Sequence, residues 1–435
     1  MGTTADAVAA RLRESLLHDK EELEVDKIFR ALVKIEGSDL HMKVGQPPMV
    51  RTRGELKALN RPPIDSEEMV RLLLPMMDER NLLIFEEDGG ADFSHTIDVD
   101  GTRWRFRVNM LKSLGNIGLV ARRISNFIPD FRGLFLPDSI EGLCHYDQGM
   151  VLLAGVTGSG KSTTIGSMLN YINTIYRKHI LTLEDPIEFI FTEDKCLINQ
   201  REVKQHTASF KRALKAALRE DPDIVLVGEL RDLETIEIAI ETAETGHLVF
   251  GTLHTTTAPS TVDRIIDQFP AERQSQIRTM LSSSLKGVVA QTLCKRQEGG
   301  RVAALEVLAV NSAVSSLIRE GKTHQIMSVM QMGAKSGMIL LNDALTKLVA
   351  SGEVAPREAY SKAIQKDAFV ESLHAAGVNW HPGVVGQAPM PASPLPKAPA
   401  DMPADLTPEH GEAPPAAPAA APLGLRFGGM VAHPP

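Results

Sequence analysis

Eight residues near the middle of the chain carry the clearest chemical signal in the sequence. Residues 155–162 read Gly-Val-Thr-Gly-Ser-Gly-Lys-Ser and fill every required position of the phosphate-binding loop G-x-x-x-x-G-K-[ST]. In such a loop, glycines let backbone N–H groups turn towards phosphates, a lysine reaches the β- and γ-phosphates, and a hydroxyl ligates Mg²⁺. The nucleotide-binding residues predicted from this loop are Gly155, Thr157, Gly158, Ser159, Gly160, Lys161, Ser162 and Thr163. Lys161 is also a candidate catalytic residue, and Ser162 is a candidate metal ligand.

The flanks of the loop favour a nucleotide site over a tight glycine turn. An apolar run, Met150–Ala154, precedes it, and a helix-like stretch, Thr163–Ile175, follows it. Strand, loop and helix in this order are typical of a phosphate-binding loop, and the helix N-terminus adds positive potential.

Acidic residues follow the next expected strand, which covers residues 179–184. The segment 183–188 reads Leu-Glu-Asp-Pro-Ile-Glu. Acids at the carboxyl end of a neighbouring parallel strand lie beside the phosphate loop, where Glu188 or Glu184 could deprotonate an attacking water. A simpler alternative is that these carboxylates cap the following turn.

A second acid follows the apolar strand Asp223–Val227, which resembles a Walker B strand. Gly228 stands where the metal-binding aspartate of that motif is common, and the acid is Glu229. Glu229 would act on Mg²⁺ through water or position the nucleophile. The division of roles between Glu188 and Glu229 therefore stays open.

Two histidines bracket the strand expected at Leu248–Leu253. His254 falls at its carboxyl end and is followed by three threonines, which is where a γ-phosphate sensor would lie. His247 precedes the strand. The alternative for each is a hydrogen-bonded structural histidine.

Arginines alternate with apolar residues in an expected strand near the N-terminus. Residues 103–109 read Arg-Trp-Arg-Phe-Arg-Val-Asn, so the arginines share one face, and the pair Arg122–Arg123 closes the neighbouring expected strand. This face is either a solvated surface or a set of arginines that includes Arg107 and reaches a nucleotide held by another domain or subunit.

The composition indicates a soluble globular protein with more than one domain. The chain has 435 residues, of which 43% are apolar and 23% charged, and its formal net charge of −8 is not that of a protein that coats nucleic acid. Three widely spaced cysteines suggest neither disulfides nor a zinc site. We find no signal peptide pattern or long uncharged apolar run, so we expect a cytoplasmic protein that meets a membrane through partners.

Element patterns divide the chain into five parts. The C-terminal part is rich in Ala and Gly and holds 14 of the 26 prolines, so we expect it to be disordered. The parts are an N-terminal extension 1–24, an α+β domain 25–130 with an antiparallel sheet, a linker 131–149, an α/β domain 150–380 with a parallel doubly wound sheet and C-terminal helices, and the tail 381–435.

Within these parts the sequence predicts individual helices and strands. Helices are predicted at Val25–Ile35, Ser66–Met77, Phe210–Arg219, Asp232–Thr245, Pro259–Thr292 and from Ser312 to about Ala363. Strands are predicted at Ser38–Val44, Met49–Leu56, Phe93–Val99, Arg103–Met110, Asn116–Ile124, His179–Glu184, Ile224–Gly228 and Leu248–Leu253, with a hairpin turn at Asp100–Gly101.

Taken together, these segments resemble the secretion ATPases and, within them, the PilT-type retraction ATPases of the type IV pilus, which power twitching motility. The resemblance covers about residues 25–351. Its matching stretches are Gly37–His41, Arg105–Asn109, Gly155–Thr163, Ile180–Phe189, Cys196–Val203, Asp223–Thr235, Thr245–Thr255 and Asp263–Pro270.

The resemblance implies a PAS-like N-terminal domain, a RecA-like ATPase domain, ATP and Mg²⁺ as ligands, and a homohexamer at the inner face of the cytoplasmic membrane. The implied partner is the inner-membrane platform protein of the pilus. By motif position, Glu188 matches the catalytic glutamate and Glu229 the Walker B glutamate. Arg107 and Arg122 match arginines presented to the nucleotide. The histidines of the family's His box are matched by His247 and His254.

One segment departs from the family pattern. Retraction ATPases usually carry Ala-Ile-Arg-Asn-Leu-Ile after the core, whereas residues 313–318 here read Ala-Val-Ser-Ser-Leu-Ile. The leading hypothesis is a hexameric ATP-hydrolysing motor for pilus retraction. The alternatives are an accessory PilU-like paralogue, a regulatory subunit that hydrolyses weakly, and a RecA-like nucleic-acid motor, against which the acidic balance and the 5% aromatic content weigh.

Overall fold

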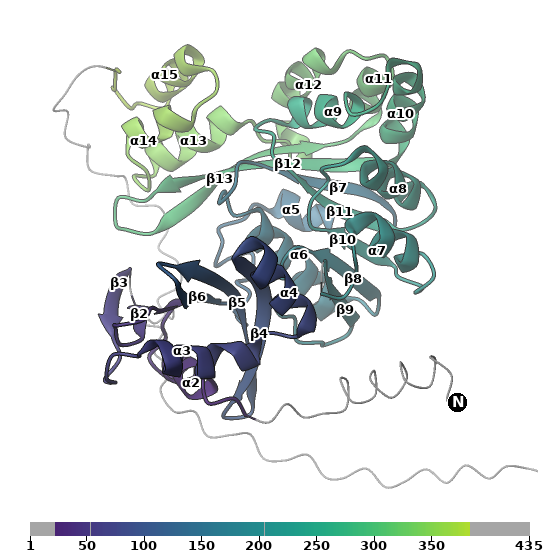
Figure 1. The fold of residues 1–435 in the computed structure, drawn as a ribbon. Helices are drawn as coiled ribbons and strands as arrows, with labels where there is room; N and C mark the ends of the chain where they lie inside the picture. The colour runs from purple at the N-terminus through teal and green to yellow at the C-terminus, as the bar shows by residue number, and fades with distance from the viewer. Residues whose placement is uncertain (1–21, 53, 204, 383–435) are drawn as a thin grey trace, which may run out of the picture. The chain divides into compact units, whose positions relative to one another are not determined.

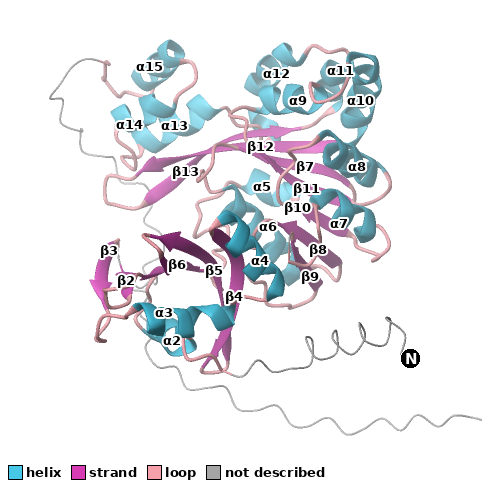
Figure 2. Ribbon diagram, in the orientation of Figure 1, coloured by secondary structure: helices cyan, strands magenta, loops and turns pink. Residues whose placement is uncertain are grey.

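The computed structural model describes residues 22–52, 54–203 and 205–382 (Figure 1). The expected tail 381–435 and N-terminal extension 1–24 therefore lie almost wholly outside the described residues. Two separate β-sheets organise the described part, one before and one after residue 130, as the colouring by secondary structure makes clear (Figure 2). No helix in the described ranges is both long and apolar enough to cross a membrane.

The first sheet has six strands in the order β3-β2-β1-β6-β5-β4, and every neighbouring pair is antiparallel. Phe29, Phe106 and Met110 are among the fully buried side chains between this sheet and its helices. The elements are α2 (Asp26–Lys34), β1 (Asp39–Met42), β2 (Met49–Thr52), β3 (Glu55–Ala58), α3 (Ser66–Leu73), the 3₁₀ helix η1 (Leu74–Met76), α4 (Glu79–Asp88), β4 (Gly90–Val99), β5 (Thr102–Ser113) and β6 (Asn116–Arg123).

Most predictions for this region are confirmed. Asp100 and Gly101 both have positive φ angles, 51° and 79°, and they turn β4 into β5 as the Asp-Gly pair predicted. The single strand predicted at Met49–Leu56 is wrong, because the segment folds back on itself and forms the antiparallel pair β2 and β3. Helix α4 was not predicted.

The second sheet has seven strands in the order β13-β12-β7-β11-β10-β8-β9, and only the pair β12 and β13 is antiparallel. Alternate residues of β7 enter two different cores, which shows that helices cover both faces of the sheet. The elements are α5 (Asp138–Leu143), β7 (Gly149–Ala154), α6 (Lys161–Ile175), β8 (His179–Glu184), β9 (Leu197–Glu202), α7 (Phe210–Ala217), β10 (Ile224–Val227), α8 (Leu233–Glu244), β11 (Leu248–Leu253), α9 (Ala258–Ile266), α10 (Ala271–Ser284), β12 (Leu285–Lys295) and β13 (Arg301–Ala309).

The expected α/β alternation is confirmed. Helices were predicted from Pro259 to Thr292, and α9 and α10 confirm the first part of that range, but the last part is wrong. Residues 285–295 form β12, which pairs in parallel with β7. A strand that is buried on both faces has no period-two alternation, so its apolar run is easily taken for a buried helix. Strands β9 and β13 were not predicted.

Short helices complete the described part of the chain. Helices α13 to α15 pack over one end of β12 and β13, where Cys294, Ala304 and Phe369 share a core. The elements are α11 (Ser312–Arg319), η2 (Thr323–Gln325), α12 (Ile326–Met332), η3 (Ala334–Ser336), α13 (Leu341–Ala350), α14 (Pro356–Lys362) and α15 (Lys366–Ala375). The two sheets fall inside the predicted domains, whose boundaries stay a prediction.

Candidate active site

The phosphate loop connects the carboxyl end of β7 to the first residue of α6. Gly155, Gly158 and Gly160 have φ angles of 147°, 77° and 91°, which side chains other than that of glycine rarely adopt. A Cβ at Gly155 would lie 2.4 Å from Gln291 O, and one at Gly160 would lie 2.7 Å from Gln291 Nε2. Glycine is therefore required at these positions, by backbone angle at all three and by the close approach of Gln291 at Gly155 and Gly160.

The Lys161 ammonium group lies over the backbone carbonyls of the loop. Lys161 Nζ donates to Gly155 O at 2.7 Å and to Val156 O at 3.2 Å. Burial lowers the pKa of the Lys161 ammonium, and the nearby Glu229 carboxylate opposes that effect. The Ser159 hydroxyl is buried and has no hydrogen-bond partner. Lys161 Nζ could exchange the loop carbonyls for phosphate oxygens.

The three remaining loop residues of the prediction lie at the loop surface or at the start of α6. Thr157 and Ser162 are exposed, and Thr163 is half-buried. The Ser162 hydroxyl is therefore accessible to a metal ion at the helix N-terminus.

Gln291 in β12 makes hydrogen bonds to the phosphate loop and to α6, and its role was not predicted from the sequence. Its Nε2 donates to Ser159 O at 2.9 Å, and its Oε1 accepts from the Thr164 hydroxyl at 2.8 Å. Gln291 and Thr164 are both buried. The sequence offers one signal for this role, since Gln291 directly follows the apolar run Val288–Ala290. A buried amide in such a run needs hydrogen-bond partners.

At the end of β10, Glu229 forms a compact polar group with residues of two neighbouring segments. His254 Nε2 lies 2.9 Å from Glu229 Oε1, and Arg231 also pairs with this carboxylate oxygen. His254 directly follows β11, the strand between β10 and the phosphate-loop strand β7. The structure thus brings Glu229 and His254 together at the carboxyl ends of the parallel strands. The phosphate loop and Lys161 lie at the same end of the sheet.

Gly228, which occupies the usual aspartate position, is tightly packed. A Cβ there would lie 3.0 Å from Leu183 O and 3.2 Å from Glu184 Cα. The position has no room for an aspartate unless the backbone of β8 moves, so Glu229 is the carboxylate that this strand offers.

The sequence predicted that the acidic segment after β8 follows a strand next to the phosphate-loop strand β7. That prediction is wrong, because β8 is not a neighbour of β7. Strands β11 and β10 lie between β7 and β8, which separates the two ends by about 14 Å at 4.8 Å per strand. Strand order depends on how the whole chain packs, so it could not be taken from order along the chain. The segment instead returns towards α6, where the Phe189 ring packs against Gly166. Gly166 is about 7.5 Å along the helix from Lys161.

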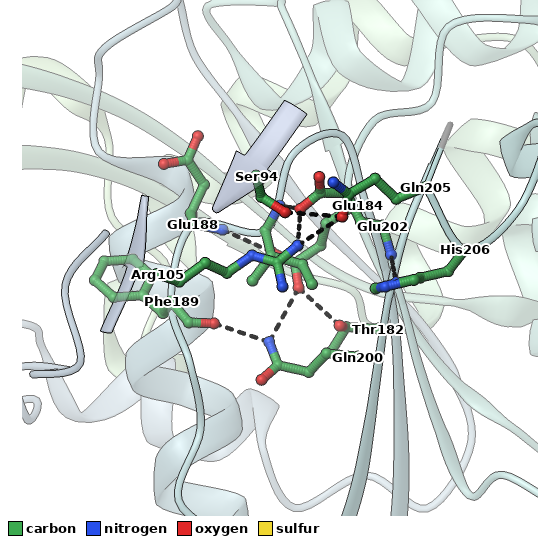
Figure 3. A network of polar contacts seen from close by, with 11 residues as sticks. Ser94, Arg105, Thr182, Glu184, Glu188, Phe189, Gln200, Glu202, Gln205 and His206 are labelled. Atoms are coloured by element: carbon green, nitrogen blue, oxygen red, sulfur yellow. Dashed lines mark hydrogen bonds and ion pairs between the residues drawn. The ribbon is translucent and has the colours of Figure 1, made fainter. Parts of the chain in front are cut away.

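Glu184 and Glu188 differ sharply within this segment (Figure 3). Glu184 is buried, and burial raises its pKa to about 7, although hydrogen bonds from Thr182 and from the Glu188 backbone N–H favour the charged form. Glu188 is exposed. Of the two, Glu188 is the side chain that can meet a nucleotide and a water.

His247 does not join the other predicted site residues. It precedes β11, whereas His254 follows it, and seven residues of extended chain span about 23 Å. Its Nδ1 lies 3.1 Å from Thr242 O, at the opposite edge of the sheet from the phosphate loop. This geometry fits the structural alternative within one chain and does not fit a contact with the nucleotide of the same chain.

Arg107 and Arg122 face each other across β5 and β6. Both are exposed, and Arg122 Nε donates to Asp39 Oδ1 at 2.9 Å. The alternation predicted for residues 103–109 is confirmed, because Phe106 and Val108 are buried on the other face. Arg105 reaches the second sheet, because its Nη2 donates to Glu202 Oε2 on β9 at 2.8 Å.

Comparison with known proteins identifies relatives of this arrangement. Residues 18–361 match the family described as type II/IV secretion system protein. The type IV pilus retraction ATPase PilT of Pseudomonas aeruginosa is 45% identical over 341 residues, which are 78% of this chain and 98% of that protein. A twitching motility protein of Neisseria gonorrhoeae is 47% identical over 73% of this chain and 84% of its own. The type IV pilus ATPase PilU of Pseudomonas aeruginosa is 36% identical over 78% of this chain and 89% of its own.

A solved structure resembles the fold as well. The crystal structure of the pilus retraction motor PilT with bound ADP has a TM-score of 0.74 and 44% sequence identity, and it covers 80% of this chain and 99% of that chain. The phosphate loop, the two sheets and these relatives agree, and the chain belongs to the type II/IV secretion system protein family, of which it is an ATPase.

Proposed function

We propose that this chain is the ATP-hydrolysing motor that powers type IV pilus retraction. The observation that carries the nucleotide part is the phosphate loop, where glycine is required and the Lys161 ammonium is bonded to loop carbonyls. The pilus part rests on PilT, whose length this chain matches almost completely, at higher identity than it matches PilU.

In the proposed site, Lys161 exchanges the carbonyls of Gly155 and Val156 for the β- and γ-phosphates of ATP. The described residues contain no group of three or more His, Cys, Asp or Glu side chains that could hold a metal alone. Mg²⁺ needs no such group, because it keeps waters and binds through one or two protein ligands and the phosphates. The accessible hydroxyl of Ser162 and the carboxylate of Glu229 fit this role, and Mg²⁺ would supply neutralisation of phosphate charge.

Glu188 is proposed as the general base for the attacking water, because it is exposed and its loop lies against α6. Glu229 would then help to hold Mg²⁺. His254 would sense the γ-phosphate through its contact with Glu229. Arg107 and Arg122 are proposed to act on the nucleotide of a neighbouring subunit, which their exposed face on the first sheet supports.

The proposed assembly is a homohexamer in the cytoplasm at the inner face of the cytoplasmic membrane. Each cycle of hydrolysis would change the angle between the two domains. The ring would pass this movement to the inner-membrane platform protein of the pilus, without direct contact to nucleic acid.

A second candidate function is an accessory, PilU-like or regulatory subunit with weak hydrolysis. The observation in its favour is the pair Ser315–Ser316, which stands in α11 where retraction ATPases usually carry Arg-Asn. A rate of hydrolysis measured on the purified chain separates the two candidates.

The test is an ATPase assay of the purified protein, with and without DNA, together with a mass measurement of its oligomer. We expect steady hydrolysis that DNA does not stimulate, loss of hydrolysis in Lys161→Ala, and a mass of six chains. DNA-stimulated hydrolysis would favour a nucleic-acid motor, and nucleotide binding without turnover would favour the regulatory subunit.

A further inference from the structure

The loop that carries Glu188 is held by side chains of the neighbouring strand β9 (Figure 3). Glu202 Oε2 accepts from the Ile187 N–H at 3.2 Å, and Gln200 Nε2 donates to Phe189 O at 2.8 Å. Gln200 and Glu202 are two residues apart in a strand and so share one face. The backbone on both sides of Glu188 is therefore fixed by a pair of side chains from one rigid element.

Glu202 also receives a hydrogen bond from the first sheet. Arg105 Nη2, on β5, donates to Glu202 Oε2 at 2.8 Å and to Gln205 Oε1 at 3.0 Å, and Ser94 Oγ on β4 donates to Gln205 Oε1 at 2.8 Å. The side chains of Arg105 and Glu202 are 14% and 6% exposed. Water therefore screens this ion pair only weakly, and its strength depends closely on geometry.

A backbone contact supports the same connection. Ser125, just beyond β6, forms an isolated parallel bridge with Phe189, the residue after Glu188. The loop is thus connected to the N-terminal part of the chain in two ways. Phe189 contacts Ser125 directly, and Ile187 is connected to Arg105 through Glu202.

We infer that Arg105 and Glu202 are positioning residues that make the placement of Glu188 depend on the placement of the N-terminal domain. With Arg105 seated on Glu202, the Ile187 N–H is held and Glu188 is presented to the nucleotide. When the N-terminal domain moves away, Glu202 loses its counter-charge and the loop loses a fixed anchor. This inference rests on the proposed role of Glu188 in hydrolysis.

The test uses the full-length protein and compares kcat with nucleotide affinity. The variants are Arg105→Ala, Glu202→Ala and the double variant. Arg201→Ala is the control, because Arg201 is the adjacent residue of β9 and its removal breaks a more exposed ion pair, with Glu220, on the other face of the strand. Affinity is measured with a fluorescent ATP analogue, and thermal unfolding confirms that each variant is folded.

We expect both single variants to lower kcat by about 10- to 100-fold, the cost of a misplaced catalytic group, while affinity stays within about twofold. The double variant should be no slower than the slower single variant, because both changes break the same connection. Glu202→Gln should be faster than Glu202→Ala, because its amide oxygen still accepts from Ile187.

Normal kcat in folded Arg105→Ala, or an equal loss in Arg201→Ala, would overturn the inference. Additive losses in the double variant would overturn it as well. Failure of the proposed function looks different, since the wild-type protein would then not hydrolyse ATP or Glu188→Gln would turn over normally.

Discussion

Replacing Gln291 by leucine tests whether the phosphate loop is held in shape from β12. The substitution keeps the approximate size of the side chain and removes both polar groups of the amide. It therefore leaves the Thr164 hydroxyl and the Ser159 carbonyl without the bonds of 2.8 Å and 2.9 Å that Gln291 makes.

The expected cost can be worked out from burial. Thr164 is 1% exposed and Ser159 is 2% exposed, so water cannot easily replace the lost partners. A buried polar group left unpaired costs about 1–3 kcal/mol, so two such groups cost roughly 2–6 kcal/mol. For a domain of this size, that corresponds to a fall of about 4–24 °C in Tm.

The assay is thermal unfolding, followed by titration with a fluorescent ATP analogue. We also expect ATP affinity to fall at least about tenfold, equivalent to 1.4 kcal/mol, because the loop loses its fixed backbone. Gln297→Leu is the control, since Gln297 lies on the exposed turn after β12, and its Tm should stay near that of the wild type. A Gln291→Leu protein that melts and binds ATP like the wild type would refute this reasoning.

The remaining predictions concern the acids and arginines of the site. Gly228→Asp should lower the Tm and the ATPase rate, because the new Cβ would lie 3.0 Å from Leu183 O. Overpacking of this kind costs about 1–3 kcal/mol, and a variant more active than the wild type would contradict this prediction. Burial raises the pKa of Glu184 from 4.5 to about 7, so the folded state holds a proton that the unfolded state has lost, and stability should fall as pH rises from 4.5 to 7. Glu184→Gln should weaken this dependence of the free energy of unfolding on pH, as measured by denaturant titrations at several pH values. An unchanged pH dependence in the variant would count against the raised pKa of Glu184 as its cause. Mixing Arg107→Ala with Lys161→Ala subunits should restore part of the ATPase rate if the arginine acts across an interface, and a mixture as inactive as its components would exclude that arrangement.

Features with a local physical cause were predictable from the sequence. The phosphate loop needs glycines because of backbone angles set within eight residues, and the β4–β5 turn needs Asp100–Gly101 for the same reason. Helix α8 is capped at its N-terminus by Asp232, whose side chain accepts from the Thr235 N–H, and it ends before Gly246.

Features that depend on the order of strands in the sheet were not predictable in this way. The position of β8, two strands away from β11, is set by packing between segments far apart in sequence. The same is true of Gln291, which lies 132 residues after Ser159 and yet bonds to it. His247 was placed at the site by its motif position alone, and β11 separates it from His254 by about 23 Å within one chain.

The most direct test of the central claim is to image labelled type IV pili in living cells of the organism that encodes this chain, with its gene replaced by Lys161→Ala. Lys161 is the loop residue that must meet the phosphates, and its loss should stop ATP hydrolysis without removing the protein. We predict that cells with the wild-type chain retract their pili, whereas cells with the variant at equal protein level keep extended pili that do not retract. Retraction at the wild-type frequency in the variant cells would contradict the proposal that this chain is the retraction motor.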